Sequence, residues 1–164
     1  MRKRHAIALA GCVVLLGMSQ PSSADPLAIA KAFCAAQTAG GSDEMRPLMT
    51  RDLRAVVEEA EARDRSIAQS GSGVLSPLAG GVPYQSFAQP AERCVPGKVA
   101  SASNIDLVDI AYSNRDEANG GWTDQLVLKR EDGELRIDDI LFANFPTDTY
   151  KAGLRRVLAD SFDN

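Results

Sequence analysis

Hydrophobic positions recur every three or four residues in the segment that follows residue 24, and this spacing predicts helices. Asp25 followed by Pro26 is a typical helix start, because Asp caps the free N–H groups and Pro suits the first turn. The inward-facing positions of this first helix are Leu27, Ala30, Phe33, Cys34 and Gln37. Gly40 and Gly41 then end the pattern.

Two further helices are expected before residue 70. A short one begins at Ser42 and carries Met45, Leu48 and Met49. Thr50 is the expected N-cap of a longer one, whose apolar positions are Leu53, Val56, Val57, Ala60 and Ile67. The charged residues between them are typical of a solvent-exposed helix face.

The helical spacing ends near Ser70, and the chain as far as about Lys98 is rich in glycine and proline. A structureless stretch of about 30 residues is unusual inside one domain and is often functional or disordered. We therefore treat residues 70–98 as one irregular segment. Tyr84 and Phe87 are expected to pin its middle to the rest of the protein and are candidate residues for the wall or rim of a pocket.

The last third of the chain changes to the alternation of β-strands. Strands are predicted over residues 105–112, 122–130 and 134–142, and Asp132-Gly133 predicts a tight hairpin turn between the last two. Thr147 or Asp148 is expected to cap a terminal helix that bears Tyr150, Leu154, Leu158 and Phe162. Helices followed by an antiparallel meander predict a single α+β domain over residues 25–164.

The first 24 residues have the features of an export signal. Arg2, Lys3 and Arg4 precede an apolar run from Ala6 to Met18, and small residues end the segment at Ala24. The run is too short to span a bilayer, so cleavage after Ala24 and a periplasmic location are expected. Leu9-Ala10-Gly11-Cys12 is similar to a lipoprotein signal, but it lies inside the apolar run, and lipidation is the less favoured alternative.

The composition of the mature chain argues against several kinds of site and partner. His5 is the only histidine and lies in the signal, so the commonest general base and neutral metal ligand is removed with it. We therefore predict no metal and no cofactor. Cleavage also removes three of the 18 basic residues and none of the 22 acidic ones, which leaves a net charge of −7. Such a chain is not expected to bind nucleic acid or to insert stably into a membrane.

Cys34 and Cys94 are the two cysteines of the expected mature chain. An even pair in an oxidising compartment predicts a disulfide. The bridge would tie the first helix to the far end of the irregular segment, although two separate buried thiols are the alternative.

Carboxylates are the remaining candidates for chemistry. Strict alternation in the last strand would place Asp139 on the apolar face with Leu135, Ile137 and Leu141, and would leave Asp138 exposed at little cost to substitution. A buried Asp139 either works as a general acid or base with a raised pKa or, as the favoured alternative, braces the helix layer through a backbone N–H or an Arg. Tyr112 and Trp122, near strand ends, are candidate pocket or rim residues, although packing is the favoured role for Trp122.

Residues 25–33, 48–53 and 126–140 together resemble small exported bacterial domains of the nuclear transport factor two-like, or ketosteroid-isomerase-like, superfamily. Leu135 stands where a late strand of that family carries tryptophan. The resemblance implies a curved antiparallel sheet wrapped around helices, a cone whose open end holds a small apolar ligand or a protein. No catalytic motif of the superfamily matches residue by residue.

Three functions from different classes are consistent with these observations. The favoured one is a non-enzymatic periplasmic module that binds a small apolar ligand or an envelope protein at the open end of the cone. The second is a hydrolase, lyase or isomerase that works through Asp139 without histidine. The third is an envelope accessory protein or inhibitor that acts through its acidic surface.

Overall fold

The computed structural model describes residues 25–40, 42–71, 75–87, 90–114, 121–143 and 152–163. The expected signal (1–24), Thr147, Asp148 and Tyr150 lie outside these ranges. The elements in chain order are α1 (Pro26–Ala39), α2 (Ser42–Met45), the 3-10 turn η1 (Arg46–Leu48), α3 (Arg51–Gln69), β1 (Arg93–Ala102), β2 (Ile105–Ser113), β3 (Trp122–Glu131), β4 (Glu134–Leu141) and α4 (Leu154–Asp160).

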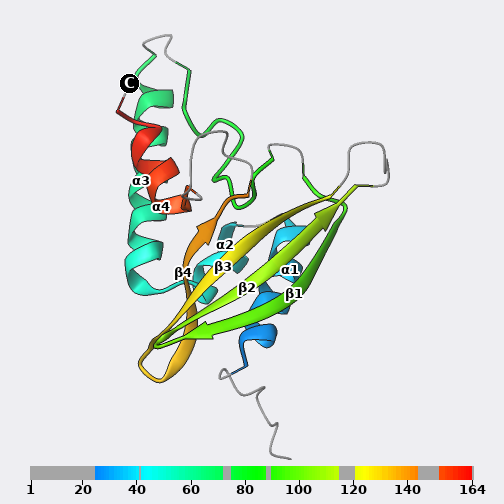
Figure 1. The fold of residues 1–164 in the computed structure, drawn as a ribbon. Coiled ribbons are helices and arrows are strands. Elements are labelled where there is room, and N and C mark those ends of the chain that lie inside the picture. Colours follow the sequence, from blue (N-terminus) through cyan, green and yellow to red (C-terminus); the bar gives the residue numbers. More distant parts are fainter. Residues whose placement is uncertain are drawn as a thin grey trace, which may run out of the picture.

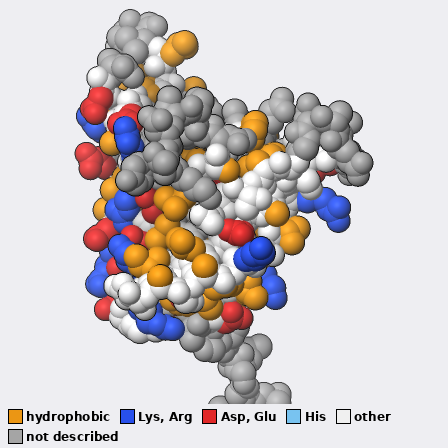
Figure 2. Space-filling model, viewed as in Figure 1, with side chains coloured by type: hydrophobic (Ala, Val, Ile, Leu, Met, Phe, Trp, Pro, Cys, Tyr) orange, Lys and Arg blue, Asp and Glu red, His pale blue; other side chains and the backbone are white. Residues whose placement is uncertain are grey.

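The fold is α+β, as predicted. A curved four-stranded antiparallel sheet in the order β1-β2-β3-β4 has α1 against one face, while α3 and α4 lie side by side beyond β4 (Figure 1). The opposite face of the sheet, toward the viewer, carries hydrophobic side chains mixed with charged ones (Figure 2). No described helix is long and apolar enough to cross a membrane.

The predicted caps of the first helices are confirmed. The Asp25 carboxylate accepts a hydrogen bond from the Leu27 N–H at 2.9 Å, and Gly40 ends α1 in the left-handed conformation with φ 75°. The Thr50 hydroxyl accepts from the Leu53 N–H at 3.2 Å and starts α3. The two helices bury Ala30, Phe33, Cys34, Ala36, Leu53, Val57 and Ala60.

The core lies between α1 and the sheet. Its largest fully buried side chains come from α1, from α3 and from alternate positions of β2, β3 and β4, including Phe33, Leu53, Ile110, Tyr112, Leu126, Leu128, Leu135, Ile137 and Ile140. Asp132 (φ 52°) and Gly133 (φ 84°) form the predicted turn between β3 and β4.

Strand β1 was not predicted. It begins at Arg93, inside the segment that sequence reasoning treats as irregular up to residue 98. Its residues are mostly exposed, and Pro96 and Gly97 lie at a break in its pairing with β2 between Pro96 and Val99. Because the strand is held by pairing with β2 rather than by an apolar face of its own, it lacks the alternation that identifies a strand.

The disulfide between Cys34 and Cys94 is present, with a Cα–Cα distance of 5.3 Å. It joins α1 to the second residue of β1 and so fixes the edge strand to the helix that covers the sheet.

A β-bulge in β4 overturns the predicted alternation at its two aspartates. Val127 of β3 pairs with Asp139, whereas the next residue, Leu128, pairs with Ile137, so Asp138 is the extra residue. Ile140 rather than Asp139 therefore follows Ile137 on the buried face. Neither aspartate faces the core, and neither is fully exposed.

The outer edge of β4 is covered by two chain segments. Thr50 donates its N–H to the Ile137 carbonyl at 2.8 Å, and Phe142 donates its N–H to the Ala152 carbonyl at 3.0 Å. The terminal helix starts immediately afterwards, at Leu154 with Gly153 as its N-cap. This start is later than the capping residues predicted from the sequence.

Candidate functional site

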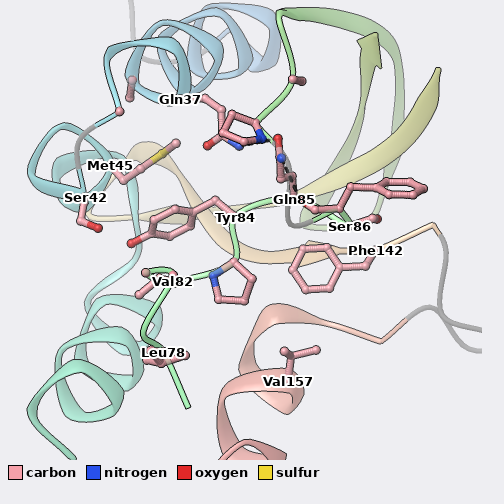
Figure 3. A pocket seen from close by; sticks show the side chains of 18 of the residues that line it. Gln37, Ser42, Met45, Leu78, Val82, Tyr84, Gln85, Ser86, Phe142 and Val157 are labelled. Carbon is pink, nitrogen blue, oxygen red and sulfur yellow. Dashed lines mark hydrogen bonds between the residues drawn. The ribbon is translucent and has the colours of Figure 1, made fainter. Parts of the chain in front are cut away.

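A cavity of about 570 Å³ opens beside the C-terminal end of α1. Its walls are α1, α2, the start of the segment after β4, α4, and residues 75–87, which we call the cavity loop (Figure 3). The volume is in the range of pockets that enclose small organic molecules.

The lining of the cavity carries no charge among the described residues. The apolar part consists of Ala36, Met45, Pro77, Leu78, Val82, Pro83, Phe87, Pro90, Ala91, Phe142 and Val157. The polar side chains are all neutral: Gln37, Ser42, Tyr84, Gln85, Ser86 and Ser161. Since 24% of the whole chain is charged, the cavity differs sharply from the rest of the protein.

Two carboxylates hold the backbone of the cavity loop. Asp64 of α3 accepts a hydrogen bond from the Leu78 N–H at 2.7 Å, and Asp124 of β3 accepts one from the Ser86 N–H at 2.9 Å. Charge-assisted bonds of this kind are stronger than neutral ones. They supply fixed backbone positions to a loop that has no regular secondary structure.

Asp124 is the central anchor of this loop. The residue is fully buried, and its carboxylate accepts hydrogen bonds from the Ser86 N–H, the Ser86 hydroxyl and, at 3.0 Å, the Ala143 N–H. The Ala143 N–H also lies 3.1 Å from the Ser86 hydroxyl oxygen. One buried carboxylate therefore joins β3, the cavity loop and the chain that leaves β4.

Three aromatic side chains are in contact, and one of them, Phe87, lines the cavity. The ring centroids of Phe87 and Trp122 are 4.6 Å apart at an interplanar angle of 52°, and those of Trp122 and Tyr112 are 5.1 Å apart at 20°. Burial raises the pKa of Tyr112, and the Asp124 carboxylate adds to the effect. Burial also raises the pKa of Tyr84, while Ser42 next to its hydroxyl opposes the shift. Both phenols are therefore neutral at ordinary pH.

A chain of two hydrogen-bonded side-chain amides, Gln37 and Gln85, forms part of the cavity wall. The Gln85 Nε2 donates to the Phe87 carbonyl at 2.8 Å, and the Gln37 Nε2 donates to the Gln85 Oε1 at 3.1 Å. Gln85 is buried, whereas Gln37 is half-buried on α1. The amides thus tie the cavity loop to α1 near the disulfide.

The structure brings some of the predicted site residues together and separates others. Tyr84 and Phe87 line the cavity, whereas Tyr112 and Trp122 stack behind Phe87 and do not line it. Asp139 lies on β4, away from the cavity lining. Gln37, Gln85 and Asp124 were missed as site residues, although a charge at position 124 among inward-facing Trp122 and Leu126 was a readable signal.

Asp139 has the bracing role that was favoured over catalysis. Its carboxylate accepts hydrogen bonds from the Ile140 N–H at 2.9 Å and from the Arg155 N–H, in the first turn of α4, at 3.3 Å. Burial raises the pKa of Asp139, and these N–H groups oppose the shift. A Cβ at Gly153 would lie 2.3 Å from the Asp139 Oδ2, so the glycine allows the strand and the helix start to approach.

Asp138 is not an isolated exposed side chain, as was expected, but the centre of an ion-pair cluster. Its side chain is 14% exposed and contacts Lys129 at 2.5 Å, Arg155 at 3.1 Å and the Thr50 hydroxyl at 3.2 Å. Burial acts to raise the pKa of Asp138, but the Lys129 hydrogen bond and the charges of Arg155 and Lys129 outweigh it and lower the pKa.

Replacing Asp138 with Asn should therefore lower the free energy of unfolding by about 1 to 2 kcal/mol at pH 7, rather than leave it unchanged. Because the folded pKa is lowered, the stabilisation is complete above the unfolded pKa of about 4 and is lost as the pH falls through the folded value. In urea titrations between about pH 2 and 6, the difference in the free energy of unfolding between wild type and variant should shrink as the pH falls. A constant difference would mean that the charge of Asp138 does not matter.

No protein-family model, curated protein or solved structure matches the chain. The described residues contain no group of three or more His, Cys, Asp or Glu side chains placed to hold a metal ion.

Proposed function

We propose that the chain is a binding module whose cavity takes a small, uncharged and mainly apolar molecule. The observation that carries this proposal is the neutral lining of the cavity in a strongly charged protein. A charged ligand would lose its hydration there without meeting a counter-charge, which is costly, whereas apolar surface gains about 25 cal/mol for each Å² buried.

The anchoring of the cavity loop supports a preformed site. Asp64, Asp124 and the Gln37–Gln85 pair hold the loop at three places, and the disulfide fixes the strand that follows it. A ligand that enters a cavity already ordered loses less affinity to the ordering of the protein.

Binding of a neutral apolar dye tests the proposal. N-phenyl-1-naphthylamine should bind with a micromolar Kd and a saturable rise in its fluorescence. The substitution Val157→Phe, which adds bulk to the α4 wall of the cavity, should weaken binding at least tenfold. The matched control is Val95→Phe, at a β1 valine that is 53% exposed and does not line the cavity. Equal binding by both variants, or none by the wild type, would contradict the proposal.

The proposed setting is the periplasm, after removal of residues 1–24. A disulfide within the remaining chain supports an oxidising compartment. We also retain membership of the nuclear transport factor two-like superfamily as a proposal. It is supported by the curved antiparallel sheet packed against α1, with a cavity at one end.

A further inference from the structure

The hydrogen bonds of the Gln37–Gln85 amide chain run in one defined direction. The Phe87 carbonyl can only accept a hydrogen bond, so the Gln85 nitrogen must face it, at 2.8 Å. With the opposite orientation of Gln85, two oxygens would face each other. The Gln85 oxygen is therefore turned to Gln37, and it requires the Gln37 nitrogen as its donor, at 3.1 Å.

This direction leaves the Gln37 amide oxygen facing the cavity. Figure 3 shows this oxygen on the side of Met45 and Tyr84, away from Gln85. It accepts no hydrogen bond from any residue that the structure describes, and Gln37 lines the cavity. A carbonyl oxygen at the edge of an apolar cavity is unpaired once a ligand displaces water from it, unless the ligand itself carries a donor.

We infer that Gln37 selects, within the proposed class of uncharged ligands, those that carry an O–H or N–H hydrogen-bond donor. The inference rests on the proposed function, because it concerns the same cavity. The apolar walls set the affinity for the hydrocarbon part of the ligand, and the Gln37 oxygen discriminates between a polar donor and an apolar group of the same shape.

Two probes of nearly the same shape test this selection. 2-Naphthol carries a hydroxyl donor where 2-methylnaphthalene carries a methyl group, and equilibrium dialysis measures the Kd of each. The ratio of the two affinities should fall about tenfold in Gln37→Met relative to the wild type. Loss of the Gln37–Gln85 hydrogen bond also loosens the cavity loop, but this weakens both probes alike and cancels in the ratio. Gln37→Leu, which also lacks the acceptor, should give the same loss. The exposed Gln69→Met, outside the cavity lining, serves as the matched control and should leave the ratio unchanged.

The outcomes separate the inference from the function on which it rests. If both probes bind but the ratio is the same in the wild type, Gln37→Met and Gln37→Leu, the role of Gln37 is overturned and the apolar cavity stands. A ratio that falls equally in Gln69→Met also overturns it. If neither probe binds the wild type, the proposed function fails together with the inference.

Discussion

A double substitution of Cys34→Ser and Cys94→Ser should lower the free energy of unfolding by about 4 kcal/mol, the largest of the effects that we predict. The bridge closes a loop with a sequence separation of 60 residues. Cross-linking removes conformational entropy from the unfolded chain in proportion to the logarithm of the loop length, and this logarithm gives the expected magnitude. Urea titration under non-reducing conditions measures the loss.

The wild type in reducing agent provides the control. It should unfold at the same urea concentration as the double variant, and the variant should not respond to the reducing agent. Alkylation of the protein purified from its native compartment should find no free thiol among Cys34 and Cys94. Two free thiols there would contradict both the bridge and the proposed periplasmic setting.

The second largest effect is expected at Asp124. Replacing it with Ala should lower the free energy of unfolding by about 3 kcal/mol, because the Ser86 and Ala143 donors lose their buried acceptor. The same change releases the cavity loop from β3, so binding of N-phenyl-1-naphthylamine should weaken in parallel. Asp124→Asn keeps one acceptor oxygen, so its free energy of unfolding and its affinity for the dye should both fall less.

Trp122 provides the measurement for the Asp124 variants. It is the only tryptophan of the chain, and its ring contacts the tilted ring of Phe87, the residue next to Ser86. Its emission should shift to longer wavelength in Asp124→Ala at low urea concentration, before global unfolding, because the loop that covers it is released. Asp109→Ala serves as the control: this half-buried carboxylate accepts a hydrogen bond from Gln125 and does not contact the cavity loop. An equal shift in Asp109→Ala would refute the anchoring role.

Helices α1 and α3 were predictable from the sequence because their signals are local. The caps at Asp25 and Thr50 and the spacing of Phe33, Leu53 and Val57 each depend on residues within one or two turns. The turn at Asp132-Gly133 is equally local, since two consecutive residues with positive φ favour that dipeptide.

The features that could not be predicted from the sequence, namely strand β1, the bulge in β4 and the course of the cavity loop, depend on partners that are distant along the chain. Strand β1 is defined by its pairing with β2 and by the bond to Cys34, not by a pattern of its own. The bulge places Asp138 in contact with Lys129, Arg155 and Thr50, and no spacing within β4 reveals these partners. The cavity loop likewise receives its anchors from Asp64 and Asp124, and its own glycines and prolines give no indication of them.

The disulfide has a topological consequence for the cavity. All of the lining residues except Phe142, Val157 and Ser161 lie between Cys34 and Cys94 in the sequence, so the cavity is built almost entirely within one covalent ring. A protease that cuts the cavity loop once would open the ring without separating the two pieces. The nicked protein would retain both walls on one molecule, a useful property for the proposed binding function in the proposed periplasmic setting.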